Sequence, residues 1–156
     1  MTSVGRPTPS PSPVDWTAKL PSGKRSGKVP VEAKGDPVID RITLTGLTAT
    51  GFHGVFPQER REGQPFVVDV ELELTVDTVS DQLANTVNYA EIAADVEAVV
   101  TGEPRNLIET VAGEIADRCL SHGRVDRVTV TVHKPKAPIN QTFTDVSVTI
   151  SRSRHV

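Results

Sequence analysis

The feature that most constrains the fold is an apolar residue at every second position from Phe66 to Val76. The apolar side of this alternation consists of Phe66, Val68, Val70, Leu72, Leu74 and Val76. Three of the intervening residues are acidic, namely Asp69, Glu71 and Glu73. Because successive side chains of a β-strand point to opposite faces, the pattern predicts a strand with one buried and one solvated face. Such a strand is typical of an antiparallel sheet that is covered on one side.

Three shorter segments repeat this alternation, and two segments between them change to helical spacing. The further strand residues are Ile42 and Leu44, then Val128, Val130 and Val132, and finally Val146, Val148 and Ile150. The helical residues are Ile92, Val96, Val99 and Val100, followed by Leu107, Val111, Ile115 and Cys119. The order ββααββ predicts an α+β fold in which both helices cover one face of a four-stranded antiparallel sheet. The sheet has two free edges, and edge-to-edge assembly into a ring would protect them.

Each expected helix begins with an Asn that is followed three residues later by a Glu. The pairs are Asn88 with Glu91 and Asn106 with Glu109, and both are typical of a capping box. For Glu109 this capping role is a sufficient structural explanation, so the spacing alone assigns it no chemistry.

Residues 1–37 differ in composition from the rest of the chain. They contain seven of the twelve prolines and are otherwise rich in Ser, Gly and Lys. Few apolar residues are present to offset the entropy of ordering, so we expect a disordered tail followed by one domain over residues 38–156. A passive extension is favoured over a partner-binding arm. The tail has six Lys/Arg and three Asp/Glu, whereas the domain has eleven and seventeen, and an acidic domain argues against nucleic-acid binding.

The cysteine and histidine content argues against a disulfide and a metal site. Cys119 is the only cysteine and is expected to be a small buried hydrophobe. The four histidines, His53, His122, His133 and His155, have no ligand spacing with one another or with Cys119. No apolar run is long enough to span a bilayer, so we expect a soluble, cytoplasmic protein.

Four segments contain residues suited to chemistry: residues 51–66 (GFHGVFPQERREGQPF), 87–92 (VNYAEI), 106–116 (NLIETVAGEIA) and 133–143 (HKPKAPINQTF). In the last, Lys134 follows an expected strand and precedes Pro135, which stiffens the loop. Lys134 could therefore exchange protons or simply be a solvated charge. Tyr89 could equally be a half-buried aromatic residue, and His53 could form hydrogen bonds within its own turn.

Together with DRITLTGL at 40–47, these segments resemble the dihydroneopterin aldolases in order and approximate spacing. The resemblance covers residues 40–152. It implies the tunnelling fold, in which sheets of several subunits join into a tetrameric ring and two rings commonly stack into an octamer. It also implies a pterin substrate and active sites at subunit boundaries. The implied reaction is a retro-aldol cleavage of 7,8-dihydroneopterin that needs no cofactor, metal or Schiff base.

The resemblance also implies roles for individual residues. Lys134 resembles the main general acid/base, Tyr89 the phenol that exchanges protons, and Glu59 the carboxylate that orients the lysine or its water. Glu109 resembles the anchor of the pterin. The remaining implied substrate-binding residues are Ile108, Asn88 and Val87. Two positions depart from the family pattern, since Asn88 stands where many relatives have His and Asn140 stands where Pro is common.

The sequence leaves two alternatives to the aldolase function open. One is a pterin epimerase of the same fold, acting on dihydroneopterin or its triphosphate, and epimerisation is also a possible side activity of the aldolase. The other is a noncatalytic pterin-binding ring protein. This protein would keep Glu109 but could dispense with Lys134, Tyr89 and Glu59, all of which are present. The sequence does not distinguish a tetramer from an octamer.

Overall fold

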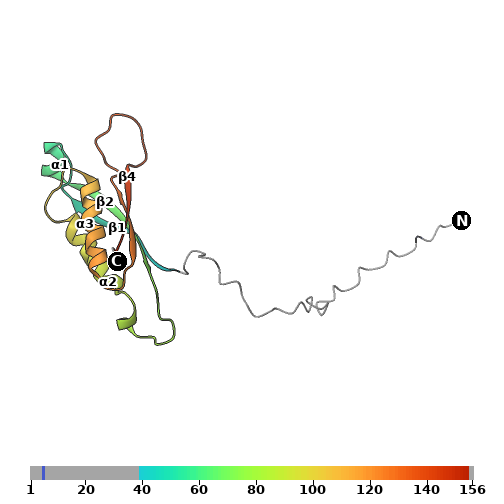
Figure 1. Ribbon diagram of the computed structural model, residues 1–156. Helices are drawn as coiled ribbons and strands as arrows, with labels where there is room; N and C mark the ends of the chain where they lie inside the picture. The colour runs from blue at the N-terminus through green and yellow to red at the C-terminus, as the bar shows by residue number, and fades with distance from the viewer. Residues whose placement is uncertain (1–4, 6–38, 155–156) are drawn as a thin grey trace, which may run out of the picture. The chain divides into compact units, whose positions relative to one another are not determined.

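The computed structural model describes Gly5 and residues 39–154. The expected disordered tail, residues 1–37, lies outside the described residues apart from Gly5. The helices and strands of the described residues form a single sheet with the helices on one face of it (Figure 1).

The sheet has four strands in the spatial order β1-β2-β3-β4, and all neighbours are antiparallel. The strands are β1 (Asp40–Gly51), β2 (Gln64–Leu74), β3 (Arg127–His133) and β4 (Ser147–Ser153). The expected antiparallel sheet is confirmed, and β1 and β4 are its edges. The expectation that the second strand extends to Val76 was wrong, because the Val76 N–H binds the side chain of Asp40 at 2.9 Å instead of continuing the ladder.

The strand β1 is interrupted by a bulge that the sequence did not predict. Its register with β2 shifts between Leu44 and Leu47, and Gly46 within this stretch has φ of 77°. Glycine adopts this left-handed conformation without the steric cost that a side chain would add. The Gly46 N–H is satisfied by the carboxylate of Asp69 at 2.7 Å, so the bulge is fastened to β2 by a side chain.

Two long helices, α2 (Tyr89–Val100) and α3 (Ile108–Ser121), cover the apolar face of the sheet (Figure 1). The five apolar residues of β2 that face them, Phe66, Val68, Val70, Leu72 and Leu74, are completely buried. The helices contribute Ile92, Val96, Val111, Ile115 and Cys119, among others, to the same core. Each large aliphatic side chain removed from water in this way contributes about 1.5–3 kcal/mol, so the core drives the joining of helices to sheet. The buried position expected for Cys119 is confirmed.

Two short helices were not expected from the sequence. Helix α1 (Pro57–Glu62) lies in the connection between β1 and β2, and the 3-10 helix η1 (Leu83–Asn85) precedes α2. The signals for α1 were present, because Pro57 opens the helix and Gly63, with φ of 69°, ends it. No helix was expected here because the segment is only six residues long and has no apolar face.

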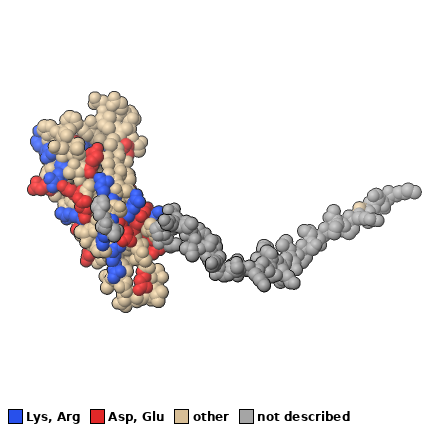
Figure 2. All heavy atoms as spheres, in the orientation of Figure 1, with Lys and Arg blue, Asp and Glu red and all other residues tan. Residues whose placement is uncertain are grey.

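On the face shown in Figure 2, Lys and Arg side chains are interspersed with Asp and Glu. Two ion pairs of α3 are Arg105–Glu114, at 2.8 Å, and Arg118–Asp95, at 3.9 Å. Within the described residues, no helix combines the length and apolar character needed to cross a membrane.

Candidate active site

A buried ion pair joins the first connection of the chain to the end of β3. The Lys134 Nζ atom lies 2.5 Å from Glu59 Oε1, and the two side chains are only 11% and 6% exposed. Glu59 stands in the first turn of α1, and Lys134 follows the last residue of β3. The interpretation of Lys134 as a solvated surface charge was therefore wrong. We call this contact the Glu59–Lys134 pair.

Three donors surround the carboxylate of Glu59. Besides Lys134, the backbone N–H of Phe56 binds Oε2 and the side-chain amide of Gln64 binds Oε1, both at 3.1 Å. Burial raises the pKa of Glu59, but the hydrogen bonds from Lys134, Phe56 and Gln64 outweigh it and hold the pKa below its usual value. Glu59 is therefore a charged acceptor at neutral pH, and it keeps the Lys134 amine oriented as a proton donor.

Gln64 is a candidate site residue that the sequence interpretation missed. It is buried, its amide nitrogen contacts Glu59, and its Oε1 has no hydrogen-bond partner among the described residues. A buried acceptor without a donor is costly unless a ligand or water supplies one. The signal was available, because position 64 continues the apolar side of the alternation that starts at Phe66, and an amide on that side requires a polar neighbour.

The turn before α1 is shaped to hold Glu59. Gly54 has φ of 148°, and a Cβ atom built on it would lie 2.0 Å from Glu59 Oε2. The carboxylate therefore packs directly on the Gly54 backbone, and only glycine leaves space for it.

His53 fastens this turn to the helical layer. Its ring is completely buried, with Nδ1 accepting from the Arg105 N–H at 2.9 Å and Nε2 donating to the Val100 carbonyl at 2.8 Å. The prediction that His53 bonds within its own turn was wrong, since both partners lie in and after α2. Burial lowers the pKa of His53, which agrees with a neutral ring that has one donor and one acceptor nitrogen.

Glu109 lies in the exposed first turn of α3, and the capping box expected there was wrong. The N-cap of α3 is Leu107, and the side chain of Asn106 instead accepts a hydrogen bond from Arg60. Arg60 also binds the Gly54 carbonyl at 2.9 Å, so the start of α3 is tied to the turn that holds Glu59. Ile108 is buried next to Glu109. The capping explanation for Glu109 is therefore gone, and its exposed carboxylate lies at the same end of the domain as the Glu59–Lys134 pair.

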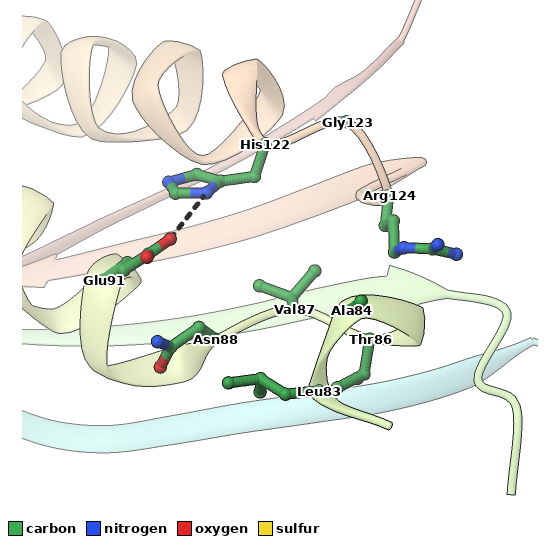
Figure 3. Close-up of a pocket in the computed structure, with 9 residues that line it drawn as sticks. All are labelled: Leu83, Ala84, Thr86, Val87, Asn88, Glu91, His122, Gly123 and Arg124. Carbon is green, nitrogen blue, oxygen red and sulfur yellow. Dashed lines mark ion pairs between the residues drawn. The ribbon is translucent and has the colours of Figure 1, made fainter. Parts of the chain in front are cut away.

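Tyr89, Asn88 and Val87 lie at the opposite end of the helical layer. Asn88 caps α2 as expected, with Oδ1 accepting from the Ala90 N–H at 3.0 Å. Val87 is buried, whereas Tyr89 is 64% exposed and so is not the half-buried aromatic residue considered above. The end of α3 lies beside the start of α2, because His122 contacts Glu91 at 3.8 Å. Figure 3 shows this contact above a pocket of about 350 Å³ that Val87 and Asn88 line.

The two groups of residues are thus separated by the length of α2. The Val100 end of α2 meets His53, and the Tyr89 end meets His122. Twelve residues at 1.5 Å each extend over about 18 Å. One chain therefore brings together Glu59, Lys134 and the start of α3, but it does not bring Tyr89 to them.

A groove of about 760 Å³ opens beside the Glu59–Lys134 pair. It lies between α1, the start of β2 and the loop after β3, and its lining includes Phe56, Glu59, Gln64, Lys136 and Asn140. Asn140 therefore borders this groove. Among residues 39–154, no three or more His, Cys, Asp or Glu side chains are grouped so that they could hold a metal ion.

The fold and the site define a class of protein: a small α+β domain with a candidate acid/base pair beside a groove. The chain belongs to the dihydroneopterin aldolase family, whose model, described as FolB dihydroneopterin aldolase, matches residues 42–151. The dihydroneopterin aldolase of Streptomyces coelicolor is 54% identical over 118 residues, which cover 74% of this chain and 99% of the relative. The Bacillus subtilis dihydroneopterin aldolase is 38% identical over 119 residues, with coverage of 74% and 99%.

Solved structures of the family have the same fold. A putative dihydroneopterin aldolase from Vibrio cholerae has a TM-score of 0.68 at 26% identity and covers 76% of this chain and 100% of its own. The Escherichia coli enzyme, solved in complex with neopterin, has a TM-score of 0.64 at 30% identity, with coverage of 73% and 99%. The Burkholderia enzyme, solved with guanine bound, has a TM-score of 0.63 at 26% identity, with coverage of 75% and 93%.

Proposed function

We propose that this enzyme cleaves 7,8-dihydroneopterin into 6-hydroxymethyl-7,8-dihydropterin and glycolaldehyde by proton transfer, in folate biosynthesis. The observation that carries the proposal is the buried Glu59–Lys134 pair beside an open groove. Family membership makes the enzyme an aldolase, and therefore a lyase. The neopterin and guanine bound by two structural neighbours support a pterin as the small-molecule partner.

The reaction needs one base, one acid and an acceptor for two electrons. A base removes the proton of the 2′-hydroxyl, the C1′–C2′ bond breaks, and its electrons pass into the N5=C6 imine of the substrate ring. Glycolaldehyde leaves, and an acid then protonates C1′ to give the hydroxymethyl product. The substrate is its own electron acceptor, so the proposal includes no metal, cofactor or imine to the enzyme. Positioned proton transfers of this kind each contribute roughly a hundred- to ten-thousandfold.

Lys134 is the proposed general acid/base, with Glu59 orienting it. The ion pair fixes the position of the Lys134 amine, as proton transfer by a positioned group requires. Tyr89 is the proposed second proton carrier, and the exposure of its phenol leaves it accessible to a substrate.

Glu109 is the proposed anchor of the pterin, in contact with the amino group and ring N–H of its planar edge. Its carboxylate is exposed and free of a capping role, so it can accept two parallel hydrogen bonds. Ile108, Val87 and Asn88 are the proposed lining of the same pocket. The sequence-based alternative of a noncatalytic pterin-binding protein is disfavoured by the Glu59–Lys134 pair, since burying an ion pair is costly without a use for it.

We further propose that each site is completed by a second copy of the chain. Tyr89 is separated from the Glu59–Lys134 pair within one chain, and among the described residues the edge strands β1 and β4 each pair with a strand on one side only. A ring of sheets would bring the Tyr89 end of one subunit to the Lys134 end of the next. A tetrameric ring, stacked to an octamer, is the assembly that the family resemblance favours. The cytoplasmic location expected from the sequence stays a prediction.

The direct test of function is product analysis after incubation with 7,8-dihydroneopterin. We expect stoichiometric release of glycolaldehyde and 6-hydroxymethyl-7,8-dihydropterin, insensitive to chelators, with the 2′-epimer as at most a side product. The epimer as the main product would assign the enzyme to the alternative activity. Recovery of the substrate as a borohydride-reduced adduct on Lys134 would contradict the proton-transfer mechanism.

The role of Glu109 is tested by Glu109→Gln, with Asp117→Asn on the exposed surface of the same helix as the control. An amide keeps one acceptor but turns a donor toward the ring edge. The variant should therefore lose about 2–4 kcal/mol of affinity for a nonreactive pterin in calorimetric titration, on the order of thirty- to a thousandfold. Its melting temperature should stay near that of the parent, because Leu107, not Asn106, is the N-cap. Equal affinity would remove Glu109 from the site.

The shared site is tested by mixing two inactive variants, Lys134→Ala and Tyr89→Phe, and reassembling them. If Lys134 of one subunit works with Tyr89 of the next, an equal mixture should recover roughly one quarter of the wild-type sites, because one neighbouring arrangement in four is intact. A mixture that stays inactive would mean that each site uses residues of one chain only.

A further inference from the structure

The ring of His133 is held between two carboxylates on the face of the sheet opposite the helices. Its Nε2 atom lies 2.8 Å from Asp69 Oδ2, and its Nδ1 atom lies 2.6 Å from Asp145 Oδ2. Asp69 belongs to β2, His133 is the last residue of β3, and Asp145 closes the connection that leads to β4. We call this arrangement the Asp69–His133–Asp145 clamp.

The clamp satisfies two charged carboxylates at once only when the ring is doubly protonated. Carboxylate oxygens are acceptors only, and a neutral imidazole has one N–H, so it could satisfy one of the two carboxylates but not both. The hydrogen bond to Asp145, followed by that to Asp69, raises the pKa of His133 against the opposing effect of burial. For Asp69, burial raises the pKa, but the hydrogen bonds from the Gly46 N–H and His133 outweigh this effect and lower it. The Asp69 carboxylate therefore stays charged.

The other charged residues that the strands direct to this face lie opposite or contact one another, not His133. Besides Asp69, two further acidic residues of β2, Glu71 and Glu73, point to this face. Arg41 of β1 contacts both of them, at 3.5 Å and 3.8 Å. On β3 itself the facing charge is Arg127, at the far end of the strand and opposite Glu73, and the facing residues of β4 from Ser147 to Ser153 are uncharged. The cation nearest to Asp69 and Asp145 is thus His133.

The clamp lies at the root of the loop that carries Lys134. We call residues 134–146 the lysine loop. Its ends are joined by a hydrogen bond of 2.7 Å from the Lys134 N–H to the Val146 carbonyl, and Asp145 directly precedes Val146. Since consecutive side chains point to opposite sides of a strand, His133 on one side fixes the backbone from which Lys134 leaves on the other. Asp69 in turn is fastened to the β1 bulge through Gly46.

We propose that His133 is a positioning residue, which as an imidazolium joins Asp69 to Asp145 and thereby fixes the direction of Lys134 toward Glu59. This rests on the proposed role of Lys134 as the general acid/base. Loss of the proton breaks one of the two contacts and frees the root of the lysine loop. The lysine then leaves its productive geometry, while the pterin anchor at Glu109, on another element, is unaffected. The expected consequence is a loss of kcat with little change in pterin affinity.

Three variants test this proposal in the full chain, with Glu71→Gln as the matched control. Glu71 lies on the same strand and face as Asp69 but does not contact His133. His133→Gln, which offers no cation, should lower kcat on the order of ten- to a hundredfold, the usual cost of a small misplacement of a catalytic group. Deprotonation of His133 should lower kcat at alkaline pH. Asp145→Asn removes one of the two carboxylates and should therefore shift this loss of kcat to lower pH. His133→Arg stays charged and can contact both carboxylates. Its kcat should therefore be near the wild-type value and should not fall at alkaline pH. Glu71→Gln should resemble the wild type.

Nuclear magnetic resonance gives a readout that does not depend on turnover. The ring ¹⁵N shifts of His133 should report an imidazolium at neutral pH, with a titration midpoint that coincides with the alkaline loss of kcat. The Lys134 ammonium signal, sharp in the wild type and in Glu71→Gln, should broaden in His133→Gln. A neutral ring at pH 7, or a Lys134 signal and kcat unchanged in His133→Gln, would overturn the positioning role. If the wild type released no glycolaldehyde, the proposed function would fail, whereas the Lys134 signal would still decide whether the clamp orients the lysine.

Discussion

Replacing Gly54 by Ala should disable the Glu59–Lys134 pair without altering any charged residue. The new Cβ would lie 2.0 Å from Glu59 Oε2, 2.3 Å from its Cδ and 2.7 Å from Oε1. Ordinary contact requires about 3.5 Å, so the carboxylate must retreat by more than about 1 Å. Such a shift breaks the 2.5 Å contact with Lys134 and the two 3.1 Å hydrogen bonds from Phe56 and Gln64.

The size of the effect follows from two contributions. A residue with a side chain at φ of 148° adds strain on the order of 1–3 kcal/mol. Removing one partner of a buried ion pair costs about 3–5 kcal/mol, and a displaced partner should cost part of that. We expect Gly54→Ala to lose about 2–5 kcal/mol of stability, a fall in melting temperature of roughly 10–20 °C. At a temperature where the variant is folded, kcat should fall by about a hundredfold, because the lysine has lost its orienting acceptor.

Gly46→Ala is the matched control for this substitution. Gly46 also has a positive φ, 77°, but an added Cβ meets nothing within 4 Å, and the N–H that binds Asp69 remains. It should cost only the strain, about 1–2 kcal/mol, and leave kcat near the wild-type value. Thermal denaturation followed by circular dichroism and glycolaldehyde release under saturating substrate measure both effects. A folded Gly54→Ala enzyme with normal kcat, or an equal loss of kcat in Gly46→Ala, would refute the reasoning.

Three further predictions concern the pH response, the thiol and the tail. Because burial lowers the pKa of His53 in the folded protein, the unfolded chain gains a proton first as pH falls below the ordinary value of 6.5, so stability should decline as pH falls further. Urea denaturation should give a shallower decline in His53→Gln, and an equal slope would exclude His53 as the cause. Burial raises the pKa of Cys119 to about 12, so a thiol reagent at pH 8 should label the denatured but not the native protein, and rapid native labelling would contradict this. Deleting residues 1–37 should preserve melting temperature and kcat, because the family match begins at residue 42; a truncated enzyme that failed to assemble would give the tail a structural role.

The sequence by itself determined the elements and their order, because these depend on short-range patterns. The alternation from Phe66 predicts a strand buried on one face, and the spacing around Ile92 and Ile115 predicts the two long helices. The cap at Asn88 is also local, since it bonds two residues along the chain. Gln64 could have been identified in the same way, as a polar residue on the apolar side of a strand.

Only the tertiary structure decided which side chains meet, because those contacts join residues far apart in sequence. The register of β2 with β3, and the packing of α1 beside them, bring Lys134 to Glu59 and bury both. His53 forms hydrogen bonds with Val100 and Arg105, which lie 47 and 52 positions further along the chain. No local sequence pattern contains these contacts. The same packing removed the capping role of Glu109 and left Tyr89 at the other end of α2. The free energy of these pairings comes from burial and from charges in a low-dielectric interior, and both exist only once sheet and helices have closed on each other.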